Sequence, residues 1–247
     1  MTTISPTHEK GSRRARLRSS MAFDGRYGRL LVALIAVIAL APLVVQGWAW
    51  KLVLAVLASA ILVTGLYAVR PTRPMLHLGL LLASVDISIG QASSWFSVEW
   101  LRVLQTILWL LTLLFVTGWI LESILAGSGA TIETLQAATC VYLLLGLIWM
   151  FVFSLIELAG AGEFQYPRGP SSDLYQDDSS QRAEFLRLLY FSYATLTTVG
   201  YGDITPSGGV ARIFAVLEAI AGQLYIAIMI ARLVGMHIGQ GPGSQKR

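Results

Sequence analysis

The chain has 247 residues, of which 55% are hydrophobic and 13% are charged, and its formal net charge is +4. A mean hydropathy of +0.65 excludes an ordinary soluble domain and indicates a membrane protein. The single cysteine, Cys140, excludes an intrachain disulfide and a cysteine-based metal centre, so we expect it to be a buried apolar residue.

Residues 1–27 are polar and basic. We expect them to form a cytoplasmic arm that sets the topology and contacts anionic lipid, and we expect no binding of nucleic acid. The apolar stretch that follows has no clear small-residue cleavage site, so it is predicted to be a retained helix and not a signal peptide. Twelve of the eighteen basic residues fall in segments that this orientation places in the cytoplasm.

Six apolar segments are long enough, or nearly long enough, to cross a bilayer. They are residues 28–45, 49–69, 75–89, 100–124, 137–158 and 209–234. Each is predicted to be a helix, because lipid offers the backbone no hydrogen-bond partners. In the third, Asp86 either pairs with a charge such as Arg102 or lies in water near the outer surface. In the fifth, Gly146 is expected to permit a close contact between helices.

The fourth segment carries one arginine, Arg102, whereas a voltage-sensing helix has a basic residue at every third position. Residues 28–125 are therefore predicted to form a four-helix membrane module that lacks the sensor arginines. A run of glycine, serine and alanine follows and predicts a flexible break. It separates this module from a pore domain at 131–239, and residues 240–247 are expected to form a short cytoplasmic tail.

The stretch from Thr198 to Gly202 reads Thr-Val-Gly-Tyr-Gly and is predicted to be a potassium selectivity filter. Gly200 and Gly202 permit backbone angles that other residues resist. The backbone carbonyls, with the Thr198 hydroxyl, can then replace the water shell of a dehydrated ion. The residues expected to bind K+ are Thr198, Val199, Gly200 and Tyr201. One chain offers one oxygen per level, so four chains are expected to meet on an axis as a homotetramer.

The apolar pattern of residues 183–197 predicts a short buried helix that re-enters the membrane, with its carboxyl end aimed toward the ion. Tyr190, Phe191 and Tyr193 on this helix are expected to form an aromatic cuff behind the filter. Asp203, just outside the filter, is expected to anchor the strand through a hydrogen bond to Tyr190 or another cuff residue.

The polar residues 160–184 are predicted to form an extracellular turret. Its acids either concentrate cations near the pore mouth or are simply solvated, because two arginines offset part of their charge. They are Glu163, Asp173, Asp177, Asp178 and Glu184.

With these elements in order, residues 131–239 resemble the pore domain of tetrameric potassium channels. The whole chain resembles bacterial six-span channels without the arginine ladder. The resemblance implies an all-α membrane protein of six transmembrane helices, with a re-entrant pore helix and filter loop between helices five and six. It also implies passive, selective K+ conduction across the cell membrane by a homotetramer with both termini in the cytoplasm, without enzymatic activity and without a cofactor.

The resemblance also suggests roles in the last helix. Gly222 falls where the family often has a hinge glycine, although it could instead serve only close packing. Gln223, Ile226 and Ile230 are then expected to line the cavity or gate. Glu218, one turn before Gly222, is expected either to bond to the back of the filter or pore helix or to act as a protonation switch. The residues expected to support the filter are Thr197, Asp203, Tyr190 and Glu218.

Two other functions fit parts of the sequence. The tetrapeptide Gly-Tyr-Gly-Asp ending at Asp203 matches the motif of intramembrane aspartyl proteases, which need a second membrane aspartate. Asp86 is the only candidate for it, and Asp86 follows Val85, not the usual tyrosine. The other alternative is a non-selective cation channel or a transporter subunit. Tyr201 argues for potassium selectivity, and a single filter per chain argues against transporters that hold four pore repeats.

Overall fold

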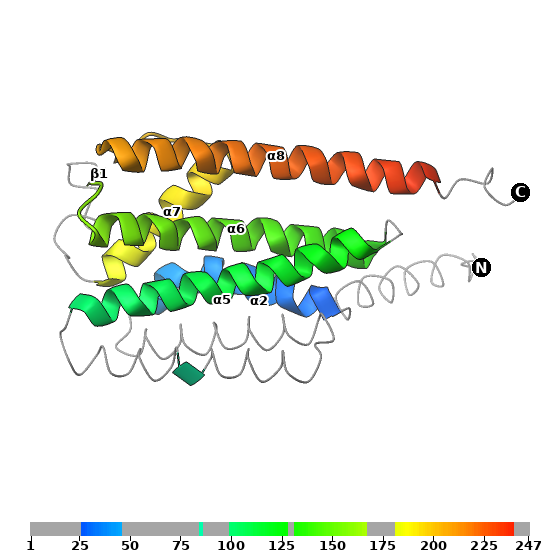
Figure 1. The fold of residues 1–247 in the computed structure, drawn as a ribbon, viewed down its shortest axis with the longest axis horizontal. Coiled ribbons are helices and arrows are strands. Elements are labelled where there is room, and N and C mark those ends of the chain that lie inside the picture. Colours follow the sequence, from blue (N-terminus) through cyan, green and yellow to red (C-terminus); the bar gives the residue numbers. More distant parts are fainter. Residues whose placement is uncertain (1–25, 46–83, 86–98, 128–130, 167–180, 240–247) are drawn as a thin grey trace, which may run out of the picture.

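The computed structural model describes residues 26–45, 84–85, 99–127, 131–166 and 181–239 (Figure 1). The described elements are α2 (Arg26–Val45), α5 (Glu99–Ala126), α6 (Ile132–Leu158), β1 (Phe164–Gln165), α7 (Gln181–Leu196), β2 (Thr205–Pro206) and α8 (Gly209–Gly239). The second predicted span, most of the third, most of the basic arm and the tail lie outside the described residues, as does Asp86.

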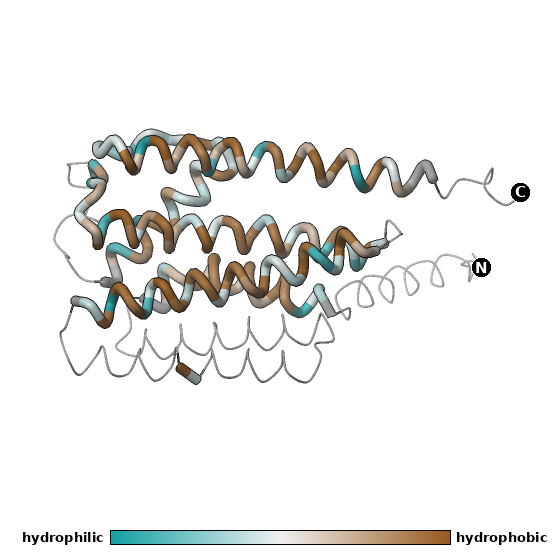
Figure 2. Tube along the Cα trace, viewed as in Figure 1, coloured by the Kyte–Doolittle hydropathy of each residue, from teal (hydrophilic) through white to brown (hydrophobic). Residues whose placement is uncertain are grey.

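Within this part of the chain, three helices are long and apolar enough to cross a membrane: Trp100–Ala126, Ile132–Leu158 and Gly209–Met236. Hydrophobic residues run along all three (Figure 2). The predicted helices at 100–124, 137–158 and 209–234 are thereby confirmed. The apolar part of α2, Tyr27–Leu43, is shorter than these three.

The fifth predicted segment begins too late, because helix α6 starts at Ile132 and not at residue 137. Thr131 has an extended backbone, and its side-chain oxygen accepts a hydrogen bond from the Thr134 nitrogen at 3.2 Å. This contact satisfies one of the free N–H groups of the first turn. The first turn of α6 contains polar residues, so the apolar pattern alone did not predict that it belongs to the helix.

Helix α6 is the centre of the described fold and packs against α2, α5, α7 and α8. The axes of α5, α6 and α8 are roughly parallel, with the chain in α6 running opposite to α5 and α8, and the short helix α7 crosses obliquely between α6 and α8 (Figure 1). Leu144, Phe153 and Cys140 of α6 are fully buried, as expected for the cysteine. The core therefore surrounds α6, and α7 is held on it.

Two glycines determine how closely α7 and its flanking segments approach α6. A Cβ atom on Gly146 would lie 2.5 Å from Cε1 of Tyr193 on α7, which confirms the predicted close contact. A Cβ atom on Gly208 would lie 2.8 Å from the Cα atom of Gly162. Larger residues at either position would push the segments apart.

The described residues are mostly helical, which agrees with the predicted all-α class, and they include one short pair of strands that the sequence did not predict. Strands β1 and β2 pair antiparallel, with Phe164 opposite Pro206 and Gln165 opposite Thr205. The Ser207 nitrogen and hydroxyl both donate to the Glu163 carbonyl, at 2.8 and 2.9 Å. Two-residue strands leave no alternation of polar and apolar residues in the sequence. The pairing ties the segment after residues 198–202 to the end of α6.

The carboxyl end of α5 is held by a side chain of α8. Nη2 of Arg232 donates to the carbonyls of Ile124 and Leu125, at 2.8 and 2.7 Å. These carbonyls lie in the last turn of α5, where the helix itself supplies no donors. Arg232 therefore links α8 to the carboxyl end of α5.

Candidate ion-conducting site

The candidate filter, residues 198–202, follows almost directly from the carboxyl end of α7 at Leu196. Thr198, Gly200 and Gly202 have φ angles of +59°, +52° and +77°, whereas Val199 and Tyr201 do not have positive φ. In a regular strand successive carbonyls point to opposite sides. Where left-handed and right-handed backbone conformations alternate along the chain, successive carbonyl groups can instead point to the same side. A row of carbonyls on one side is what coordination of a cation requires.

Thr198 was expected in the candidate filter, but its positive φ was not predicted from the sequence. A positive φ is a clear outlier for a β-branched residue, and such strain persists only where surrounding contacts enforce it. Here the Thr198 nitrogen donates to the Thr195 carbonyl at 2.9 Å, and the Gly200 nitrogen donates to the Ala194 carbonyl at 3.1 Å. These two bonds pull the start of the candidate filter back onto α7. A threonine gives no signal in the sequence that it will adopt this conformation.

The candidate filter is exposed in the single chain. Tyr201 is 74% exposed and Val199 is 51% exposed. The tyrosine ring nevertheless stacks on Tyr190, with centroids 6.3 Å apart and planes at 7°. The surface that the candidate filter leaves open is therefore available to another copy of the chain.

The aromatic cuff forms only in part. Tyr190 lies against Tyr201, as expected. Phe191 instead packs on Phe153 and Phe164, each at a centroid distance of 5.0 Å. Tyr193 donates its hydroxyl to the Leu143 carbonyl at 2.6 Å. Neighbouring residues of an α-helix point to different sides of its axis, so three near-consecutive residues do not share one face, and two of the three aromatic rings belong to the contact with α6.

Carbonyls in the last turn of α7 accept hydrogen bonds from side chains. The Thr197 hydroxyl donates to the Tyr193 carbonyl at 2.6 Å. The Tyr142 hydroxyl, from α6, donates to the Leu196 carbonyl at 3.2 Å. The supporting role of Thr197 for the filter stays a prediction, and the contact of Tyr142 with the end of α7 was not predicted from the sequence. Asp203 is exposed, and its hydrogen bond to a cuff residue stays a prediction.

Helix α8 meets α7 through Glu218 and Gly222, one turn apart. Glu218 is fully buried, and its Oε1 atom lies 2.6 Å from the Ser192 hydroxyl of α7. The position of a Cβ atom on Gly222 lies 2.6 Å from the Leu196 carbonyl oxygen. The packing role for Gly222 therefore has direct support, while the hinge role stays a prediction. Gln223, Ile226 and Ile230 are all exposed on α8, as residues lining a cavity would be in one chain.

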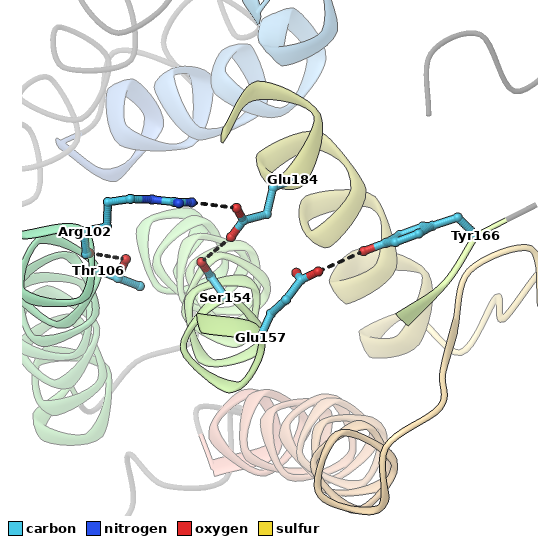
Figure 3. Close-up of polar contacts among 6 residues, drawn as sticks. All are labelled: Arg102, Thr106, Ser154, Glu157, Tyr166 and Glu184. Carbon is cyan, nitrogen blue, oxygen red and sulfur yellow. Dashed lines mark hydrogen bonds and ion pairs between the residues drawn. The ribbon is translucent and has the colours of Figure 1, made fainter. Parts of the chain in front are cut away.

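The first turn of α7 is held by a polar cluster at the other end of the helix (Figure 3). Arg102 of α5 forms an ion pair with Glu184 of α7 at 3.0 Å. Glu184 also accepts a hydrogen bond from the Ser154 hydroxyl of α6 at 3.1 Å. Glu184 is therefore not a free turret acid, which corrects the expectation for this residue. The contact joins three helices and gives Arg102 a partner on α7.

Tyr166, just after β1, completes this cluster. Its hydroxyl donates to Oε1 of Glu157 at 3.5 Å (Figure 3), and the guanidinium of Arg187 lies 4.4 Å from the centre of its ring. Burial, with a smaller contribution from the Glu157 charge, raises the pKa of Tyr166 to about 12. The phenol therefore remains neutral and acts as a donor over the whole physiological pH range.

Comparison with known proteins relates the chain to ion channels. A family model described as "Ion channel" matches residues 161–237, which include α7, the candidate filter and most of α8. Protein LctB of Bacillus caldotenax is 32% identical over 127 residues, which are 47% of this chain and 90% of LctB. The chain belongs to the ion channel family, among the potassium channel pore domains.

Two other relatives of this channel are named as potassium channels. Two-pore potassium channel 3 of Arabidopsis thaliana is 39% identical over 46 residues, which are 19% of this chain and 11% of that protein. Voltage-gated delayed rectifier potassium channel KCNH1 of Homo sapiens is 32% identical over 65 residues, which are 26% of this chain and 7% of KCNH1. The chain thus spans a small part of these two proteins. No solved structure matches this chain significantly.

Proposed function

We propose that this channel conducts K+ selectively and passively across the cell membrane as a homotetramer. Residues 198–202 are the filter: their carbonyls and the Thr198 hydroxyl replace the hydration shell of the ion, and ions advance by knock-on between neighbouring sites. The observation that carries the proposal is the alternation of φ from Thr198 to Gly202 at the carboxyl end of α7. The carboxyl end of α7 is the negative end of the helix dipole, which favours a nearby cation.

Four chains are needed to surround an ion with oxygen atoms at each level of the filter. One chain offers one oxygen at each level, and its candidate filter lies exposed. Helix α8 is mostly apolar but little buried in the single chain, with Ile213, Ile220 and Ile228 at 61%, 48% and 64% exposure. Lipid covers part of this surface, and three further copies cover the part that faces the axis. Gln223, Ile226 and Ile230 then line the cavity below the filter.

The proposed topology has six spans, with α7 re-entering the membrane between the fifth and sixth. Sixteen residues of helix rise only about 24 Å, which is less than the hydrocarbon core of about 30 Å. An outward-facing filter then places both termini in the cytoplasm. This orientation agrees with the basic residues that precede the first span.

The experiment compares K+ and Na+ flux into liposomes that contain the purified full-length chain. Gly200→Ala is the test variant, because open space surrounds the position of its Cβ and only the φ of +52° opposes the substitution. Gly160→Ala is the matched control. Gly160 also has a positive φ, of +63°, and open space around it, but it lies at the end of α6.

We expect K+ flux to exceed Na+ flux in the wild type and in Gly160→Ala, and we expect Gly200→Ala to lose the difference. Equal K+ and Na+ flux in the wild type would reject the selectivity while keeping the pore. Light scattering of the purified protein tests the assembly separately. A monomer or dimer in detergent and in lipid would reject the tetramer.

A further inference from the structure

Three helices meet at the hydroxyl group of Ser192. Ser192 lies on α7, one turn before Leu196, and is fully buried. Its Oγ atom is 2.7 Å from the Gly146 carbonyl oxygen of α6 and 2.6 Å from Oε1 of Glu218 on α8. Both distances are those of hydrogen bonds between oxygen atoms. The junction lies directly behind the end of α7 that carries the candidate filter.

The number of hydrogen atoms at this junction decides the direction of the two bonds. A serine hydroxyl has one hydrogen to donate, and a backbone carbonyl can only accept. If Ser192 donates to Gly146, the second bond needs a hydrogen on Glu218. If Ser192 donates to Glu218, the Ser192 hydroxyl oxygen and the Gly146 carbonyl oxygen lie 2.7 Å apart with no hydrogen between them. Only a carboxylic acid at Glu218 satisfies both contacts.

The surroundings of Glu218 agree with a neutral side chain. Its relative exposure is 0%, and its Oε2 atom is buried without a hydrogen-bond partner. Glu218 has no ion pair within the part of the chain that the structure describes. The titratable groups that face it are the phenols of Tyr142 on α6 and Tyr193 on α7. A buried carboxylate with no cation and an unpaired oxygen is far costlier than the neutral acid.

We propose that Glu218 is a protonated carboxylic acid that donates its hydrogen bond to Ser192 and so fixes α8 and α6 against the helix that carries the filter. Glu218 is a positioning residue for the filter, since it acts through Ser192 and α7. One turn further along both helices, Gly222 of α8 lies against the carbonyl of Leu196 of α7. The acid and the glycine together fix how α8 lies behind α7.

The protonation is tested by infrared spectroscopy of the full-length protein in lipid at neutral pH. We expect the wild type to show the C=O stretch of a protonated carboxyl group, and Glu218→Gln to lack it. Glu122→Gln is the control, because Glu122 is an exposed acid on α5, and it should retain the band. In Ser192→Ala the band should remain but shift, since the acid loses its acceptor. A wild type that shows only carboxylate bands would overturn the proposal, and so would a band that survives in Glu218→Gln.

The positioning role rests on the proposed function and is tested by flux. Glutamine keeps a neutral donor, so Glu218→Gln should retain K+-selective flux, while Glu218→Ala should lose selectivity or flux although it still assembles. Equal loss in both variants would overturn the positioning role, and so would full activity in both. If the wild type conducts no ions, the proposed function fails, but the infrared bands still decide the protonation.

Discussion

The backbone carbonyl oxygen of Leu196 lies 2.6 Å from the point that a Cβ atom on Gly222 would occupy. This contact brings the middle of α8 against the last residue of α7. Since the candidate filter begins two residues later, any side chain at residue 222 would have to move either α8 or the start of the candidate filter. Packing alone therefore requires glycine here, whether or not α8 also bends at this point.

The substitution Gly222→Ala should lower K+ flux and selectivity, and it should destabilise the assembled protein. Forcing a methyl group into a packed contact typically costs about 1–3 kcal/mol. Flux assays and thermal unfolding in detergent measure the two effects. Gly235→Ala, in the same helix with open space around it, is the control and should be neutral or slightly stabilising. Unchanged flux in Gly222→Ala would show that α8 can move away from Leu196 at no cost.

The substitution Gly146→Ala should destabilise the packing of α7 on α6. The added methyl group would lie 2.5 Å from the ring of Tyr193, which is held in place by its bond to the Leu143 carbonyl. We expect a loss of about 1–3 kcal/mol in the free energy of unfolding, as for other overpacked contacts. Gly118→Ala on α5, where nothing lies within 4 Å, provides the comparison. Equal melting temperatures for the two variants would contradict the contact.

Neutralising Arg102 should weaken the attachment of α7 without changing any response to voltage. Its side chain is 34% exposed and that of Glu184 is 18% exposed, so solvent screens the pair and the coupling should be about 1 kcal/mol or less. A double-mutant cycle of Arg102→Gln and Glu184→Gln, followed by thermal unfolding, measures this coupling. Current–voltage curves in planar bilayers should superimpose after scaling. A shift of the curve in Arg102→Gln would give this arginine a sensing role.

Tyr166 should make the protein less stable in strong alkali. Its pKa is raised from 10.0 to about 12, so between these pH values the unfolded chain releases a proton that the folded chain retains. The folded state then binds more protons, and stability falls as pH rises from about 10 to about 12. Unfolding monitored across this range, with Tyr166→Phe alongside, tests the prediction. The variant should lose less stability, and identical pH profiles would refute it.

Apolar runs and one short motif carried most of the fold prediction. The helices α5, α6 and α8 could be predicted because a bilayer requires apolar segments of a certain length. The candidate filter could be predicted because its five-residue motif is specific. The start of α6 and the pairing of β1 with β2 did not follow, because a threonine cap and two-residue strands leave little pattern in composition. The conformation of Thr198 was likewise hidden, since only bonds to α7 enforce it.

The sequence by itself determined the class of the protein and the residues of its candidate filter, because hydropathy and local backbone preferences depend on nearby residues. Only the tertiary structure decided the partners. It brought Glu218 to Ser192 and Gly222 to Leu196, which lie 26 residues apart in each pair, and it gave Arg102 a carboxylate on α7. Burial and proximity across helices arise when the chain packs, so no local pattern in the sequence encodes which side chains will meet.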